Sequence, residues 1–225
     1  MDNRQLAYQG FGQCASRGHG SQAWQEEFVS ILLNFKRDGH YLDVGSNDYA
    51  AQNNSYVLEH ILNWKGICIE IGPQYAEGYK NRNCHFINAD ATQVDYKAVF
   101  ESLGYPSRLD YLSLDCDDSS LPTLQKLPLD DYRFNTITIE HDAYRVGNII
   151  RDGEREILKK FNYVMLVEDV FAPLGCGMGP NLPFEDWWVD PAVFNMDKIR
   201  TISASGVYPD EIVGMLRKRD DVYLL

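Results

Sequence analysis

The segment "HYLDVGSNDYAAQNNSYVLE", residues 40–59, combines a short strand, a polar loop and the start of a helix. Tyr41, Leu42 and Val44 favour an extended strand, and the small polar residues after them favour a turn. The asparagines and serine at 53–55 can cap the helix that follows. A strand that leads through a loop into a helix predicts the first step of a parallel α/β sheet. Asp43 is unexpected, because it places an acid inside a strand that should be apolar.

Composition limits the classes of protein to which the chain can belong. Its 225 residues, 44% hydrophobic and 12% aromatic, suit one globular α/β domain. The net charge of −12 argues against a nucleic-acid partner, although a local arginine pocket could still bind an anionic small molecule. We find no apolar run of about 18 residues, no signal peptide and no lipidation pattern, so we expect a cytoplasmic protein without a membrane partner.

The cysteines give no sign of a disulfide framework or a zinc site. They are scattered along the chain without a C-x-x-C pair, at positions 14, 68, 84, 116 and 176. We therefore expect reduced and mostly buried thiols.

Strand-like and helix-like segments alternate along the chain. The predicted strands are residues 41–44, 66–70, 84–89, 109–115, 134–140 and 163–170, and the predicted helices are 21–36, 54–64, 73–82, 92–104, 119–127 and 152–161. This alternation predicts βαβ units in an open, doubly wound, mostly parallel sheet flanked by helices.

We expect a single domain over residues 1–225, with an N-terminal helical segment at 1–38 and a C-terminal loop or cap region at 171–225. The glycine- and proline-rich stretch 172–183 predicts a long loop, either a lid or a surface excursion. The segment "FEDWWVDPAVF" that follows fits an antiparallel strand or a helix that covers a substrate. Its two tryptophans could form a carbohydrate platform or pack in the core.

Acidic residues follow almost every predicted strand. Ligands of doubly wound sheets bind beyond the carboxyl ends of the strands, so these side chains should lie at one edge. They are Asp43, Glu70, Asp90, Asp115, Asp117, Asp118, Glu140, Asp142, Glu168 and Asp169. Each one alone could cap a helix, but so many together would repel one another without a cationic ligand or a metal.

The first loop reads G-S-N-D-Y-A and holds one glycine, so it gives little support for a pyrophosphate cradle of the G-x-G-x-x-G type. A cationic nucleoside with an amino group and a sulfonium fits better. Asp43 would organise the loop and attract positive charge, and Gly45 would let the ligand lie against the backbone. Glu70 could accept hydrogen bonds from both ribose hydroxyls, while Asp90 and the Ala91 amide could read adenine. This layout describes S-adenosylmethionine (SAM).

The chain resembles the FkbM family of SAM-dependent methyltransferases from about Ser21 to about Val170. The resemblance lies in the Ser21-Gln22 pair and in four segments: "DVGSNDYA", "NNSYVLEHILNWKGICIE", "YKNRNCHFINADAT" and "LDYLSLDCDD". It implies a Rossmann-like class I methyltransferase fold with a seven-stranded sheet, and methyl transfer to hydroxyls of sugars and natural products. The chain departs from the family pattern at Ser46, where alanine is usual, and at Tyr49, where the loop often has its last glycine.

Taken together, the pattern and the resemblance predict a set of residues that bind SAM. These are Gln22, Asp43, Gly45, Ser46, Asn47, Asn54, Ser55, Glu70, Ile71, Asp90, Ala91 and Asp115.

For catalysis we expect His141 to act as the base that deprotonates a hydroxyl acceptor, and Asp115 to orient that acceptor. His141 could instead be a structural residue bonded to nearby backbone, and Asp115 a helix cap. Asp115, Glu140 and Asp142 could also hold Mg²⁺ or Mn²⁺ through carboxylate oxygens.

Four arginines follow or flank the same strands, at positions 133, 145, 151 and 155. They could bind an anionic group of the acceptor, or they could pair with surface acids.

The sequence thus predicts a SAM-dependent methyltransferase that acts on oxygen of a sugar, glycan or phosphorylated small molecule, as in polysaccharide biosynthesis. Two alternatives stay open. One is an NAD(P)-dependent Rossmann oxidoreductase, because an acid after the second strand also suits its ribose. The other is a catalytically degenerate SAM-binding interaction module. The oligomeric state cannot be read from the sequence.

Overall fold

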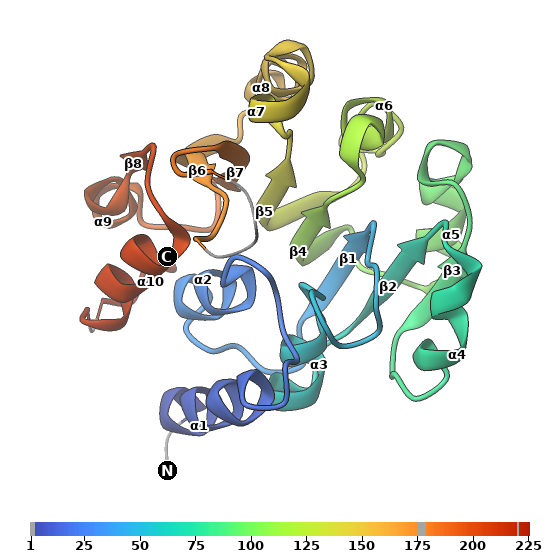
Figure 1. Ribbon diagram of the computed structural model, residues 1–225, viewed down its shortest axis with the longest axis horizontal. Helices are drawn as coiled ribbons and strands as arrows, with labels where there is room; N and C mark the ends of the chain where they lie inside the picture. Colours follow the sequence, from blue (N-terminus) through green and yellow to red (C-terminus); the bar gives the residue numbers. More distant parts are fainter. Residues whose placement is uncertain (1–2, 175–178, 220) are drawn as a thin grey trace.

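The computed structural model describes residues 3–174, 179–219 and 221–225. In this part of the chain an eight-stranded sheet runs in the order β3-β2-β1-β4-β5-β7-β6-β8 (Figure 1). The strands are β1 (His40–Val44), β2 (Lys65–Glu70), β3 (His85–Asn88), β4 (Arg108–Leu114), β5 (Arg133–Glu140), β6 (Val164–Phe171), β7 (Pro183–Val189) and β8 (Ala204–Ser205). The first five are parallel, whereas β7 is antiparallel to both of its neighbours, β5 and β6.

The predicted doubly wound, mostly parallel α/β sheet is therefore confirmed, but the predicted number of seven strands is wrong. The additional strand is β8, whose two residues pair in parallel with Val167 and Glu168 of β6. A strand this short leaves no periodic pattern in the sequence. Of the two alternatives for the segment after residue 183, the antiparallel strand is correct. It is β7, which lies between β5 and β6 with Trp187 and Trp188 fully buried.

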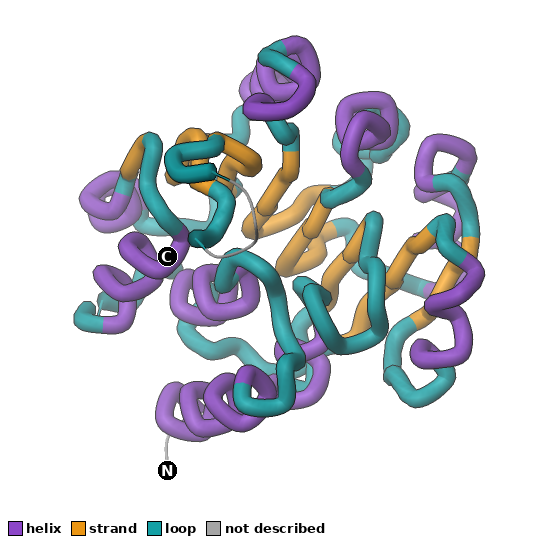
Figure 2. Tube along the Cα trace, in the orientation of Figure 1, coloured by secondary structure: helices purple, strands orange, loops and turns teal. Residues whose placement is uncertain are grey.

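Helices cover both faces of this sheet (Figures 1 and 2). They are α1 (Asn3–Ala15), α2 (Gln25–Leu32), α3 (Tyr56–Leu62), α4 (Ala76–Tyr79), α5 (Tyr96–Leu103), α6 (Ser120–Leu124), α7 (Ala143–Val146), α8 (Ile149–Lys160), α9 (Met196–Ile199) and α10 (Pro209–Arg217). Figure 1 shows α5, α6 and α8 on one face, and α1, α2, α3 and α10 on the other. No helix in the described ranges is both long and apolar enough to cross a membrane.

The two terminal regions contain regular elements. Residues 1–38 include α1 and α2. The region 171–225, where the sequence predicted a loop or cap, contains β7, β8, α9 and α10. Residues 175–178, with Cys176 and part of the predicted long loop, lie outside the described residues.

The sheet separates two hydrophobic cores, and the alternation along its strands assigns each side chain to one of them. Tyr41 and Cys68 belong to the core that includes residues of α1, α2 and α3. Leu42, Val44 and Ile67 belong to the opposite core, with residues of α5, α6 and α8. Both faces are covered, which explains why the strands read as nearly continuous apolar runs.

Asp43 shares its face with Tyr41, so it points toward α3 and away from a ligand edge. Its Oδ2 accepts a hydrogen bond of 2.6 Å from Ser55 Oγ. Burial raises the pKa of Asp43 to about 6. The Arg82 guanidinium lies in the same buried network, where it donates to Glu59 Oε2 at 3.0 Å, to Tyr41 Oη at 3.2 Å and to Ser55 Oγ at 3.2 Å. The acid inside β1 therefore has structural partners.

Asn53 and Tyr79 hold the loop between β1 and α3 from behind. The Asn53 amide donates to the Ser46 carbonyl at 2.7 Å and to the Asp48 carbonyl at 3.0 Å, and its Oδ1 accepts from the Tyr56 amide at 2.7 Å. The Tyr79 hydroxyl donates to Ser46 Oγ at 2.8 Å. These bonds fix the loop against the sheet without a ligand.

Replacing Arg82 should test this network. We expect Arg82→Leu to lower the free energy of unfolding by about 3–5 kcal/mol, because Glu59 would be left buried without its partner. Urea denaturation measures the change. The control is Lys80→Ala, whose ion pair with Glu77 is solvent-exposed and should leave the midpoint unchanged. A midpoint for Arg82→Leu equal to that of the wild type would show that the network contributes nothing.

Candidate functional site

A cavity of 490 Å³ opens at the carboxyl ends of the parallel strands β1 to β5. Its size suits a drug-sized ligand. The residues that line it are Gln22, Gly45, Asn47, Gln52, Ile69, Glu70, Ile71, Gly72, Gln74, Tyr75, Ala89, Asp90, Ala91, Asp115, Cys116, Asp117, Ser119 and Glu140. Among the described residues the lining thus includes five carboxylic acids and no lysine, arginine or histidine.

Gly45 brings the first loop directly against the end of β4. Its φ is +78°, and a Cβ added there would lie 1.6 Å from the Asp115 carbonyl oxygen. Its amide donates to the Ile69 carbonyl at 2.9 Å. Only glycine can occupy this position, and the absence of a side chain leaves bare backbone at the cavity wall.

Glu70 is held at the cavity wall by backbone amides on both sides. Its Oε2 accepts from the Asn47 amide at 2.9 Å, and its Oε1 accepts from the Gly72 amide at 2.7 Å. Each carboxylate oxygen keeps a further lone pair, so the group can still accept hydrogen bonds from two adjacent hydroxyls of a ligand. The next residue, Ile71, is 67% exposed and offers the cavity an apolar surface.

Asp90 and Ala91 line the cavity at the end of β3. Asp90 Oδ1 caps a short 3₁₀ turn by accepting from the Thr92 amide at 2.9 Å and from Thr92 Oγ1 at 2.7 Å. These hydrogen bonds lower the pKa of Asp90. The carboxylate is therefore both a cap and part of the cavity wall.

Asp115 and Glu140 follow neighbouring strands, because Leu114 of β4 pairs with Ile139 of β5. Their side chains share a hydrogen bond, and burial raises the pKa of both, that of Glu140 well above its ordinary value. Glu185 of β7 lies opposite Glu140 in the sheet. Burial also raises its pKa, to about 8.

The structure divides the predicted SAM-binding residues into two groups. Those at the cavity wall are Gln22, Gly45, Asn47, Glu70, Ile71, Asp90, Ala91 and Asp115. Asp43, Ser46, Asn54 and Ser55 are buried and are not part of the lining. Asn54, for example, donates to Ser113 Oγ at 2.8 Å. These four residues support the loop and do not face a ligand.

Sequence reasoning missed several lining residues, above all Gln52, Gln74, Tyr75, Cys116 and Ser119. Gln74 and Tyr75 follow β2, and Cys116 and Ser119 follow β4. Their position just after the strand ends was the signal that could have identified them.

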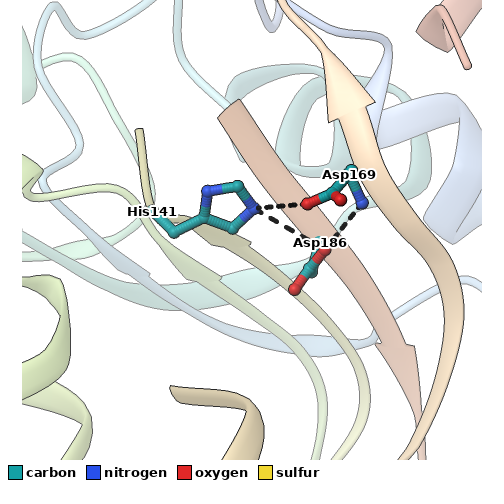
Figure 3. A group of neighbouring side chains, drawn as sticks. All are labelled: His141, Asp169 and Asp186. Carbon is teal, nitrogen blue, oxygen red and sulfur yellow. Dashed lines mark hydrogen bonds and ion pairs between the residues drawn. The ribbon is translucent and has the colours of Figure 1, made fainter. Parts of the chain in front are cut away.

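His141, the predicted base, lies outside this lining and is 1% exposed. Its Nδ1 accepts from the Ala143 amide at 3.2 Å, which places the proton on Nε2. Nε2 lies 3.7 Å from Asp169 Oδ1 and 3.6 Å from Asp186 Oδ1 (Figure 3). A base must reach the proton of the acceptor, and neither ring nitrogen faces the cavity. The geometry favours the structural alternative for His141.

The predicted metal ligands Asp115, Glu140 and Asp142 are not brought together. Asp142 is not part of the cavity lining, and its Oδ2 accepts from Arg145 Nε at 2.9 Å. In the described part of the chain, the group of acids and histidines whose atoms lie close enough to share an ion is a different one, namely His141, Asp169 and Asp186.

Arg155 already occupies the oxygens of that second group. Asp186 Oδ1 accepts from Arg155 Nη2 at 2.9 Å and from the Asp169 amide at 2.8 Å, and Asp169 Oδ1 accepts from Arg155 Nη2 at 2.7 Å. Burial would raise the pKa of Asp186, but the neighbouring His141 ring and the hydrogen bonds from Arg155 lower it to about 2. Donors fill the acceptor sites and a guanidinium balances the charge, so this cluster is a buried ion-pair network.

The four predicted anion-binding arginines form no anion pocket, because each one is paired with carboxylates. Arg133 donates to Asp190 at 3.1 Å from the amino end of β5, the opposite edge of the sheet. Arg145 pairs with Asp142 and Asp118, Arg151 with Asp169, and Arg155 with Asp186.

Comparison with known proteins gives distant structural matches. No family model and no curated protein matches the chain, so the predicted membership of the FkbM family is not confirmed. Similar solved structures include the O-methyltransferase from Bacillus cereus in complex with SAH (14% identity, TM-score 0.48, 82% of this chain and 89% of that chain). The precorrin-6y C5,15-methyltransferase from Geobacter metallireducens is also similar (14%, TM-score 0.47, 73% and 86%). So is Aeropyrum pernix fibrillarin with natively bound S-adenosyl-L-methionine (13%, TM-score 0.44, 74% and 76%).

Likeness of this degree does not tell what this chain binds or transforms. The strand order β3-β2-β1-β4-β5-β7-β6, with β7 antiparallel, is that of the Rossmann-like class I methyltransferase fold, to which β8 is added here.

The close approach at Gly45 gives a first prediction. We expect Gly45→Ala to lower the free energy of unfolding by about 2 kcal/mol or more, since its methyl group would collide with the Asp115 carbonyl in a left-handed backbone conformation. Urea denaturation measures this. Gly12→Ala, in α1 with open space around it, should keep or raise stability and serves as the control. Equal stability of Gly45→Ala and wild type would contradict the contact.

The buried acids give a second prediction, on pH. Burial raises the pKa of Glu154 on α8 to about 9, and neither of its oxygens has a hydrogen-bond partner among the described residues. At a pH between 4.5, the pKa of glutamate in the unfolded chain, and the raised pKa values of Glu154 and Glu185, the folded state binds more protons than the unfolded chain. The free energy of unfolding should therefore fall as the pH rises from about 5 to 9.

Chemical denaturation over that pH range measures the slope. Glu154→Met should flatten the slope and stabilise the protein at pH 8, because it removes a buried carboxyl that has to take up a proton when the chain folds at that pH. Glu156→Gln, on the exposed side of α8, should keep the wild-type slope. A wild-type stability that stays level or rises between pH 5 and 8 would be inconsistent with neutral buried acids.

Proposed function

We propose that this chain is a SAM-dependent methyltransferase. The observation that carries the proposal is the Glu70 carboxylate, fixed by the Asn47 and Gly72 amides on the wall of an acid-lined cavity beside the bare backbone of Gly45. A carboxylate held in this way is preorganised to accept hydrogen bonds from the two hydroxyls of a ribose.

The remaining lining residues fit the other parts of SAM. Ile71 and Ala91 would pack against adenine, with Asp90 accepting from its amino group. The amides of Gln22 and Gln52 would serve the polar amino-acid end. With one sulfonium, one ammonium and one carboxylate, SAM has a net charge of +1, which suits a wall that offers acids and no described basic side chain.

Bound SAM would supply an electrophilic methyl group on its sulfonium sulfur. The protein's contribution would be to position the acceptor in line with that methyl group and to keep water out. Asp115 would lie beside the reacting atoms, because the Gly45 backbone touches its carbonyl. Asp115 and Glu140 are the ionisable groups of the cavity that could take up a proton from the acceptor at that end.

An NAD(P)-dependent oxidoreductase is less well supported. Pyrophosphate usually sits on the N-terminus of the helix that directly follows the first strand. Here β1 ends at Val44 and α3 begins only at Tyr56, with a long loop between them. The cavity also lacks a described basic side chain that would balance two phosphates.

For the acceptor, the oxygen atom of a sugar or glycan remains a prediction from the sequence. The phosphorylated acceptor that the sequence also allowed fits poorly, because the lining would repel a phosphate and the four arginines are engaged elsewhere.

A binding experiment tests the proposal. SAM at a hundred times its Kd should stabilise the protein by about 2.7 kcal/mol, seen as a raised melting temperature, and NAD should not. Glu70→Gln should weaken SAM binding about 10-fold or more in calorimetry, through the lost charge-assisted bonds to ribose. Glu77→Gln, an exposed acid on α4, is the matched control and should bind SAM as the wild type does. Stabilisation by NAD and not by SAM would disprove the proposal.

A further inference from the structure

On the side of β4 and β5 the cavity is lined by Asp115 and Glu140. In the sheet, β2 and β5 are separated by three strand intervals, which is roughly 14 Å at about 4.8 Å each. The ribose would lie at Glu70, after β2, and Asp115 lies beside Gly45 at the boundary between β1 and β4. Glu140, after β5, is therefore the lining acid on the side away from the donor nucleoside.

These two carboxyls differ from Glu70 and Asp90, the acids of the cavity wall whose oxygens accept hydrogen bonds from backbone amides. Asp115 and Glu140 are mostly buried and share one hydrogen bond with each other. Within the described ranges, no amide, hydroxyl or basic side chain is seen to donate to either of them. Glu70, by contrast, is held by two amides, and the buried Glu59 is held by Arg82. A buried carboxylate without donors is costly unless a ligand supplies them.

None of the described residues that line this end of the cavity is basic. Arg145, which follows β5, donates to Asp142 at 2.9 Å and to Asp118 at 2.8 Å. The neighbour of Glu140 on β7 is another acid, Glu185, whose oxygens accept from Trp187 Nε1 at 2.8 Å and from Gln25 Nε2 at 3.1 Å. The strand that pairs with β5 thus places another carboxyl group, and no basic side chain, opposite Glu140.

We propose that Asp115 and Glu140 form a subsite for a cationic nitrogen, an ammonium or guanidinium group, on the methyl acceptor. The inference rests on the proposed function, since it assigns to the acceptor the part of the cavity that lies beyond the donor. Nitrogen-bound hydrogens would donate to both carboxyls in charge-assisted bonds, and the positive charge would balance the pair. The substrate class is therefore an amine-bearing or guanidine-bearing compound, such as an amino sugar, and an anionic acceptor is excluded from this position.

The test uses a small cation and its neutral counterpart as probes. The protein is saturated with SAH, whose sulfur is uncharged, and is titrated with benzylammonium and, separately, with benzyl alcohol. Backbone NMR shifts measure the dissociation constants. We expect benzylammonium to bind at least about 10-fold more tightly than benzyl alcohol.

Variants assign that preference to the two acids. Glu140→Gln and Asp115→Asn keep the shape and remove one charge each, and in both the preference for the cation should disappear. Glu101→Gln removes an equal charge from the exposed surface of α5 and should keep it. Two isosteric variants are used so that the test can still be read if one of them fails to fold.

Three outcomes would overturn the subsite: equal or no binding of the two probes by the wild type, a preference that persists in both variants, or displacement of benzylammonium by an equal concentration of MgCl₂. Failure of the proposed function shows separately, as absence of SAH binding. The same titration on the protein alone then still decides whether the acid pair binds a cation.

Discussion

The buried guanidinium of Arg82 is the interaction on which the rest of the site depends. It joins Tyr41 of the first strand to Glu59 of α3 and to Ser55, which directly precedes α3. It also reaches the Asn53 side chain at 3.2 Å. Asn53 in turn holds the carbonyls of the loop after β1. That loop presents the Asn47 amide to Glu70. One cation in the interior therefore orders the chain segment that gives the cavity its shape, and the cavity wall itself needs no basic side chain.

Two kinds of acid lie along the carboxyl edge of the sheet. Those near Arg145, Arg151 and Arg155 are neutralised by ion pairs and fasten β6, β7 and α8 to one another. Those at the cavity are held by amides or by each other and remain available to a ligand. The difference explains why a high density of carboxylates is compatible with a stable fold and with a cationic ligand.

The sequence predicted most of the fold because the six main strands are short apolar runs between recognisable helices, and parallel topology brings their ends to one edge. It therefore also predicted most of the lining, from Gly45 to Asp115. It could not predict where the His141 ring lies. The His141 backbone amide donates to the Phe184 carbonyl at 2.7 Å, and the ring lies beside Asp169 of β6 and Asp186 of β7. That contact depends on a strand about forty residues later. Asp43 lies away from the cavity for a simpler reason: strand alternation puts it on the face of Tyr41, toward α3.

The insertion of β7 between β5 and β6 has a consequence for how the chain reaches this structure. Until β7 is in place, β5 has an open edge beside Ile137 and Ile139, and β6 pairs only with the two residues of β8. Sheet closure must therefore wait for a segment that is distant along the polypeptide, and such non-local pairing is slow. During that wait the unpaired apolar edge can recruit another chain, so aggregation would compete with folding at this step. Trp187 and Trp188 become fully buried when β7 docks, so a change in their fluorescence would report the closure of the sheet.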